Sequence, residues 1–158
     1  MSKALLVAML PLGVLLGSFA SETSKSDREA ITQTALDYGQ GWYEGNAERM
    51  ERALHPDLAK RALMADPRSG KGKMDHIGAQ ALVQAVQKGG GTTTPPDQRR
   101  TDVTILDVYG NAASVKMEMH DWIDYMHMSK IEGRWVIVNV LWELTPSAKK
   151  KYGIPDTL

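Results

Sequence analysis

The sequence contains no cysteine, and this single absence excludes several classes of protein. Without a thiol the chain cannot form a disulfide, a thiolate nucleophile, a cysteine-ligated zinc site or a lipid anchor on cysteine. An excess of one charge is also lacking, because 19 Lys and Arg residues balance 19 Asp and Glu residues. A neutral chain gives no electrostatic reason to expect nucleic acid as a partner, and we predict none.

Apolar residues are plentiful enough for one folded domain. The 158 residues are 42% hydrophobic, which suits a single globular domain with its own core. The nine methionines fit an ordinary core and an adaptable apolar cavity equally well.

Residues 1–20 have the features of a signal peptide. Lys3 supplies a positive start, residues 4–16 form an apolar run, and Ser18 and Ala20 are small residues where a signal peptidase reads the chain. We predict cleavage after Ala20 and a periplasmic or secreted protein with no stable membrane insertion. The alternative is a retained membrane anchor. It is the weaker reading, because a span needs about 20 apolar residues and Pro11 interrupts this run.

Helical patterns dominate the first half of the mature chain. After a disordered stretch at residues 21–26, Ser26 and Glu29 have capping-box spacing for a helix that reaches Gly45. An apolar stripe at helical spacing faces the core from this helix: Ile31, Ala35, Tyr38 and Trp42. The pattern then predicts a short helix at 47–54, a weak strand at 58–65, a turn-rich loop at 66–73 and a helix at 75–87.

Strands dominate the second half. Two hairpins are predicted, 100–109 with 112–120 across Gly110-Asn111, and 124–131 with 134–144 across Glu132-Gly133. Helices followed by strands indicate an α+β fold, with a curved antiparallel sheet wrapped as a cone around the long first helix. The domain would cover residues 27–145, and residues 146–158 would form a loose C-terminal extension.

The register of the last hairpin decides which side chains share a face. Pairing Ile131 with Arg134 predicts a concave face that carries Asp124, Met126, Met128, Trp135, Ile137, Asn139, Leu141 and Glu143. The opposite, outer face would be largely apolar, and a monomer rarely exposes such a patch. We therefore predict a homodimer through the outer residues Tyr125, His127, Val136, Val138, Val140 and Trp142.

Two motifs carry a resemblance to a known superfamily. The early one comprises Tyr38, Gly41-Trp42-Tyr43, Gly45-Asn46 and His55-Pro56-Asp57, and the late one comprises Asp124-Tyr125, Gly133-Arg134-Trp135 and Val138-Asn139. With this order of elements the chain resembles the nuclear transport factor 2-like superfamily, and within it the putative lumazine-binding (SnoaL-like) branch. The resemblance implies the cone-shaped fold. It leaves the activity open, because this fold hosts enzymes, binding modules and dimerisation domains.

One enzyme class of the superfamily can be compared residue by residue. Ketosteroid isomerases use a tyrosine on the first helix, which Tyr38 matches, and a general base on the first strand, where this chain has Ala62. Alanine cannot accept a proton, so the resemblance does not extend to the isomerase mechanism unless a neighbouring carboxylate substitutes for the base.

The candidate site lies between the first helix and the concave face. Asp124 among apolar neighbours would become an acid or base through desolvation, or it would be a structural carboxylate hydrogen-bonded to Asn139 or to loop amides. Tyr38 and Trp42 would either hold a flat ligand or pack in the core. The complete predicted ligand-binding set is Tyr38, Trp42, Met126, Met128, Trp135 and Asn139.

His55 completes the candidate catalytic set with Asp124 and Tyr38, although a helix-terminal role is an alternative for it. None of the four histidines has the spacing of a metal-binding pair, so we predict no metal and no cofactor. The first hypothesis is binding of a small apolar or aromatic molecule. The alternatives are a cofactor-independent lyase or isomerase, with Asp124 or His55 moving a proton and Tyr38 steadying an oxyanion, and a non-catalytic dimerisation or assembly module.

Overall fold

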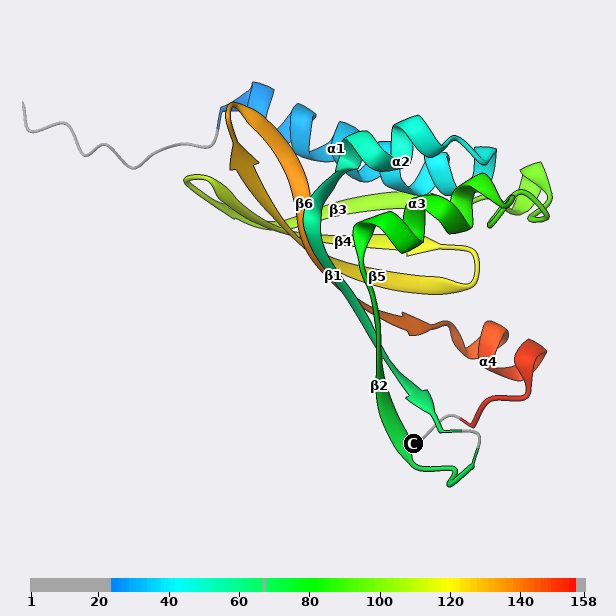
Figure 1. The fold of residues 1–158 in the computed structure, drawn as a ribbon. Helices are drawn as coiled ribbons and strands as arrows, with labels where there is room; N and C mark the ends of the chain where they lie inside the picture. Colours follow the sequence, from blue (N-terminus) through cyan, green and yellow to red (C-terminus); the bar gives the residue numbers. More distant parts are fainter. Residues whose placement is uncertain (1–23, 67, 156–158) are drawn as a thin grey trace, which may run out of the picture.

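The computed structural model describes residues 24–66 and 68–155, in which a curved six-stranded sheet wraps around three helices (Figure 1). The elements are α1 (Lys25–Glu44), α2 (Ala47–Ala53), β1 (Leu54–Ala65), β2 (Gly72–Ile77), α3 (Ala79–Gln87), the 3-10 helix η1 (Pro96–Gln98), β3 (Thr101–Tyr109), β4 (Ala112–Met119), β5 (Trp122–Ile131), β6 (Arg134–Leu144) and α4 (Pro146–Tyr152). The α+β prediction is confirmed. The signal-peptide prediction for residues 1–20 lies outside the described residues.

Helix α1 forms the axis around which the sheet curves. Its N-cap is Ser24 rather than the predicted Ser26, and the Ser24 hydroxyl accepts a hydrogen bond from the Asp27 N–H at 3.1 Å. Gly45 ends the helix at φ +66°, a left-handed conformation that glycine adopts without strain. The predicted core stripe is confirmed, because Ile31, Ala35 and Tyr38 are buried and Trp42 packs against them.

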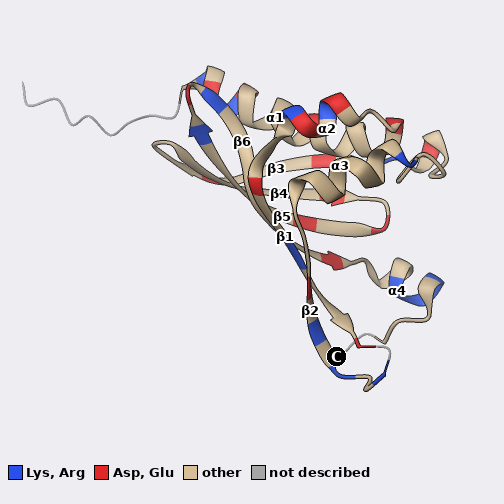
Figure 2. Cartoon of the chain, viewed as in Figure 1, with Lys and Arg blue, Asp and Glu red and all other residues tan. Residues whose placement is uncertain are grey.

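A charge cluster fastens α2 to α1. Arg49 and Arg52 donate to opposite oxygens of the Asp37 carboxylate at 3.1 and 3.0 Å, and Arg49 also reaches Glu44. Figure 2 shows acidic and basic segments side by side on α2. Burial alone would raise the pKa of Asp37, but the hydrogen bonds from Arg52, Gln33 and Arg49 outweigh it, so the net pKa is lowered.

The strand order is β2-β1-β6-β5-β4-β3, and it contains one parallel pair, β1 with β6. The sheet is therefore mixed, whereas the sequence predicted an antiparallel one. Strand β2 was also missed, since Gly72–Ile77 was divided between a loop and the start of a helix. This segment pairs with Lys60–Ala65, which satisfies the backbone groups of both strands, and α3 begins only at Ala79.

A bulge in the β5–β6 hairpin corrects the predicted register. The turn and the pairs up to Met128 with Ile137 are confirmed, but His127 then pairs with Asn139 and leaves Val138 as an extra residue. Because side chains alternate along a strand, one extra residue moves every later side chain to the opposite face. Met126 therefore pairs with Val140.

Five predicted face assignments are wrong as a result. Asp124 pairs with Trp142, so Trp142 and Val140 belong to the concave face rather than to the outer one. Asn139, Leu141 and Glu143 belong to the outer face instead of the concave one. The interface predicted for the homodimer thus loses Val140 and Trp142.

A second bulge interrupts β3–β4. Tyr109 pairs with Ala112 across the predicted Gly110-Asn111 turn, but the register shifts between Ile105 and Asp107 and leaves Leu106 exposed. Val103 and Ile105 pack against the core.

Both ends of the described chain are more ordered than predicted. Thr145 caps α4 through its hydroxyl, Pro146 occupies the first turn, and Ala148 is fully buried, so the prediction of a loose extension was wrong for Pro146–Tyr152. Residues 24–26 of the stretch predicted as disordered form the cap and first turn of α1. Within residues 24–66 and 68–155, no helix is both long enough and apolar enough to cross a membrane.

Candidate functional site

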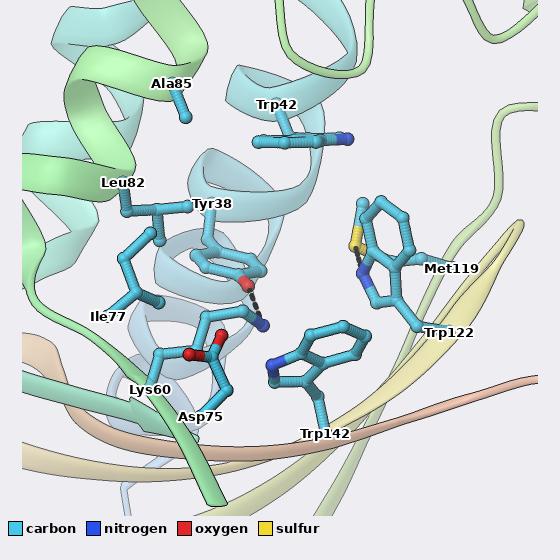
Figure 3. Close-up of a pocket in the computed structure, with 10 residues that line it drawn as sticks. All are labelled: Tyr38, Trp42, Lys60, Asp75, Ile77, Leu82, Ala85, Met119, Trp122 and Trp142. Carbon is cyan, nitrogen blue, oxygen red and sulfur yellow. Dashed lines mark hydrogen bonds between the residues drawn. The ribbon is translucent and has the colours of Figure 1, made fainter. Parts of the chain in front are cut away.

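A cavity of about 220 Å³ opens between α1, α3 and the concave face of the sheet (Figure 3). Its wall is built from seven elements and consists of Tyr38, Trp42, Lys60, Asp75, Ile77, Leu82, Ala85, Met119, Trp122 and Trp142. Most of these side chains are apolar and four of them are aromatic. Such a lining is typical of small-molecule sites.

Three tryptophans form the aromatic part of the wall. The Trp42 and Trp122 rings lie 5.7 Å apart at 77°, and the Trp122 and Trp142 rings lie 6.2 Å apart at 67°. Both pairs are edge-to-face, a favourable arrangement for aromatic rings. The Trp122 indole N–H points to the Met119 sulfur at 3.1 Å, which orients that ring. The cavity therefore presents ring edges and faces from several directions.

The position of Trp42 depends on the glycines that follow α3. A Cβ at Gly91 or at Gly90 would overlap the Trp42 indole, so only glycine lets the chain pass this close to the ring. These glycines are residues of the site that cannot be recognised from the sequence. Their spacing to Trp42 in the sequence gives no signal of the contact.

One end of the cavity is polar. There, Lys60 Nζ donates to Asp124 Oδ1 at 2.6 Å and to the Tyr38 hydroxyl oxygen at 2.8 Å. Lys60 is 8% exposed and Asp124 is fully buried. The Lys60 ammonium also lies 5.0 Å from the centre of the Trp142 ring. A buried charge pair of this kind needs such partners, because isolated charges are costly to desolvate.

Lys60 and Tyr38, the two members of this cluster that line the cavity, both have shifted pKa values. Burial lowers the pKa of Lys60, and the charge and hydrogen bond of Asp124 oppose that shift only in part. Burial, followed by the negative charge of Asp124, raises the pKa of Tyr38 well above its ordinary value. Tyr38 therefore remains a neutral phenol.

The cluster has unused hydrogen-bonding capacity. Lys60 has three N–H donors, and two of them serve Asp124 and Tyr38. Asp124 Oδ2 is buried and has no hydrogen-bond partner among the described residues. Since Lys60 is the donor to Tyr38, the phenol keeps its own proton for another acceptor. The cluster can therefore donate to a ligand oxygen and exchange protons with it.

The predicted site residues divide into those that line the cavity and those that lie elsewhere. Tyr38 and Trp42 line it, and Asp124 contacts it through Lys60. Met126, Met128 and Trp135 are buried in the core and do not contribute to the cavity wall.

Two predicted residues lie away from the cavity. Asn139 is on the outer face, where its Oδ1 accepts from Arg61 at 3.0 Å and its Nδ2 lies 3.3 Å from His127, so its predicted pairing with Asp124 is wrong. His55 lies at the start of β1, and its Nδ1 accepts a hydrogen bond from the backbone of Asp57. Within the described residues, no three His, Asp or Glu side chains are grouped as a metal site.

Lys60 is the most important residue that the sequence analysis missed. The sequence shows only that Leu58, Lys60 and Ala62 alternate on one face of the strand; the burial of Leu58 and Ala62, which places Lys60 inward, is known from the structure. Trp142 was missed because the bulge moved it between faces, and Asp75 and Ile77 were missed together with β2.

Solved structures with the same architecture share little sequence with this chain. A nuclear transport factor 2-like protein of unknown function from Methylobacillus flagellatus KT is 23% identical, covers 78% of this chain and 96% of its own, and has a TM-score of 0.61. One from Shewanella baltica OS155 is 17% identical, covers 77% and 95%, and has a TM-score of 0.57. One from Novosphingobium aromaticivorans, described with a cystatin-like fold, is 16% identical, covers 79% and 88%, and has a TM-score of 0.55. These likenesses show the fold alone.

Among curated proteins, none matches the chain. The family described as "Putative lumazine-binding" matches residues 26–143, which is most of the chain. The protein therefore belongs to the putative lumazine-binding family, and its fold is that of nuclear transport factor 2-like proteins.

Proposed function

We propose that this protein binds a small, mainly apolar or aromatic molecule in the cavity between α1, α3 and the sheet. The observation that carries the proposal is that four aromatic side chains line the cavity and that the buried polar cluster of Lys60, Asp124 and Tyr38 lies at one end of it. Aromatic and aliphatic walls favour a flat apolar body, and a few placed polar groups fix its orientation. The ligand would place an oxygen or nitrogen acceptor at Lys60.

The volume of the cavity limits the size of the ligand. A cavity of about 150 Å³ is enough to bind benzene, and drug-sized ligands occupy roughly 300–1,000 Å³. At about 220 Å³, this cavity suits one substituted ring or a branched aliphatic group of similar size. The family description names lumazine, whose planar ring system makes it a suitable probe beside simpler ring compounds.

Binding can be measured by quenching of tryptophan fluorescence, because three of the four tryptophans line the cavity. Benzyl alcohol, toluene and lumazine are the probes. Ala85→Phe fills the cavity from α3, whereas Ala81→Phe adds the same ring to an exposed position of that helix. We expect saturable binding to wild type and to Ala81→Phe, and at least a tenfold loss in Ala85→Phe. If no probe saturates the wild type, or if Ala85→Phe binds equally well, the proposal is wrong.

We also propose that the protein is exported. The charged start, the apolar run and the small residues before the predicted cleavage point support this proposal. N-terminal sequencing of the protein recovered from its native host should begin at Ser21. Recovery of a chain that still begins at Met1 would contradict cleavage.

A homodimer through the outer face is the third part of the proposal. Tyr125 and Leu141 pair across β5 and β6 on this face and are 47% and 50% exposed, which supports an apolar contact with a second copy. Sedimentation should show a dimer for wild type and a monomer for Leu141→Glu. The matched control is Leu106→Glu, which is equally exposed on the edge strand β3. A monomeric wild type would refute this part.

A further inference from the structure

Lys60 is unusually buried for a lysine. Its backbone lies in β1 next to the central strand β6, and its side chain ends inside the molecule, at the polar end of the cavity. Lysine is almost never this buried unless it is paired or functional. Pairing with Asp124 explains why the charge is tolerated. It does not explain why the amine also borders an apolar cavity.

The amine has an open side that faces the cavity. Asp124 and Tyr38 occupy two of its hydrogen-bonding directions at 2.6 and 2.8 Å, and the third N–H has no partner among the described residues. Figure 3 shows the Lys60 nitrogen between the Tyr38 hydroxyl and the Trp142 ring, next to the space that the aromatic walls enclose. A ligand in this space would meet the nitrogen directly.

We infer that Lys60 forms a covalent imine with a small apolar or aromatic aldehyde or ketone held in this cavity. The inference rests on the proposed binding function and adds a covalent step to it. Amines that are desolvated in apolar pockets are the ones that proteins use for such imines, since desolvation favours the uncharged, nucleophilic form. The lowered pKa of Lys60 agrees with this role.

The surrounding groups supply each proton transfer. Asp124 Oδ1 accepts one proton from the Lys60 ammonium along the 2.6 Å hydrogen bond and leaves a neutral amine. The amine nitrogen attacks the carbonyl carbon, a C–N bond forms, and the π electrons of the C=O bond move to the oxygen, to which the Tyr38 hydroxyl donates a hydrogen bond while keeping its proton. A proton then passes from nitrogen to oxygen and gives a neutral carbinolamine.

Loss of water completes the reaction. Asp124 returns its proton to the carbinolamine hydroxyl, the C–O bond breaks, and the nitrogen lone pair forms the C=N bond. The sum is one carbonyl compound and one ammonium giving one protonated imine and one water, so atoms and charge balance and no oxidant or reductant takes part.

The charges around the amine select the class of carbonyl compound. The groups that face Lys60 are Tyr38 from α1, Asp124 from β5 and Trp142 from β6, and the carboxylate of Asp75 from β2 lies in the same cavity wall. The Lys60–Asp124 pair is neutral in sum, and Asp75 adds a negative charge. A neutral aldehyde or ketone is therefore favoured over a keto acid.

The test uses benzaldehyde and cyanoborohydride near neutral pH, which reduces any imine to a stable amine that peptide mass mapping locates. Lys25 serves as an internal control, because its side chain is 93% exposed. We expect Lys60 to be labelled at least about tenfold faster than Lys25, because its amine is desolvated and lies beside the bound aldehyde. Benzyl alcohol, which has no carbonyl, should protect Lys60 from labelling and leave Lys25 unaffected.

The outcomes separate the two proposals. If benzyl alcohol quenches tryptophan fluorescence saturably but Lys60 is labelled no faster than Lys25, the imine is refuted and the binding function stands. If benzyl alcohol does not bind and Lys60 is not labelled, the binding function fails as well. Asp124→Asn, which keeps the size of the side chain, should slow the labelling of Lys60 at least tenfold in protein that still binds benzyl alcohol. Unchanged labelling in this variant would refute the proton transfers assigned to Asp124.

Discussion

Replacing Lys60 by Met should strongly destabilise the protein, because it leaves the buried carboxylate of Asp124 without its donor. Asp124 is fully buried, its Oδ2 already has no partner, and Lys60 provides the hydrogen bond to Oδ1. Removing one partner of a buried ion pair costs about 3–5 kcal/mol. That loss is a large part of a typical folding free energy of about 5–15 kcal/mol.

Replacing Asp124 by Leu in the Lys60→Met variant should restore stability. In Lys60→Met/Asp124→Leu neither charge remains, and apolar replacements for a buried ion pair are often neutral or stabilising. The double variant should therefore lie within about 2 kcal/mol of wild type, because the lost contact of the ammonium with Trp142 accounts for about 0.5–2 kcal/mol. Urea unfolding followed by tryptophan fluorescence measures both variants, with m-values compared to confirm that unfolding remains two-state.

In thermal unfolding the single variant should melt about 6–20 °C below wild type, since 1 kcal/mol shifts Tm by about 2–4 °C in a chain of this length. The reasoning is refuted if Lys60→Met costs less than about 1 kcal/mol. It is equally refuted if the double variant is as unstable as Lys60→Met alone, because the loss would then not come from an unpaired carboxylate.

Three further substitutions test other features. Gly91→Ala should cost about 1–3 kcal/mol through overlap with Trp42 and should change the tryptophan emission, whereas Gly78→Ala, whose Cβ would meet only ordinary contacts, should do neither. The folded-state pKa of Asp37 is below its reference value of 3.8. Its contribution to stability is therefore complete above 3.8 and is lost as the pH falls from there through the lower folded-state pKa, so acid titration of the urea midpoint should be shallower in Asp37→Asn. Thr145→Ala removes the N-cap of α4 and should cost about 1 kcal/mol, measured as faster hydrogen exchange in that helix, while unchanged exchange would show that the cap is unimportant.

Patterns within single segments predicted most helices and strands. The register and the faces of the strands could not be predicted in this way, because they depend on contacts between distant segments. The stripe of α1 and the turn at Glu132-Gly133 depend on spacing within one segment, so they could be read directly. A bulge depends on how two strands fit the curvature of the whole sheet, and nothing at Val138 marks it in the sequence. One such residue moved Asn139 out of the predicted site and Trp142 into it.

In the candidate site, too, residues placed by local periodicity could be predicted and residues placed by contacts between distant strands could not. Tyr38 and Trp42 were identified because helical periodicity places both on the core face. Lys60 was not identified, because it is followed by Arg61. In a strand one of two adjacent side chains points inward and the other outward, and their equal charge does not show which of them is the inward one. The burial of Leu58 and Ala62 on the same face decides between them, and it can be known only once the strand is placed beside β6.

The parallel pairing of β1 with β6 has a consequence for how the chain folds. Ala59 pairs with Asn139, 80 positions later, and Lys60 meets Asp124 across 64 positions. Contacts this distant in sequence slow folding, because long loops must close before they are formed. A chain emerging from the ribosome has only β2 to pair with β1 until β6 is free. The middle of the sheet, and the cavity with it, is therefore completed only after β6 is available.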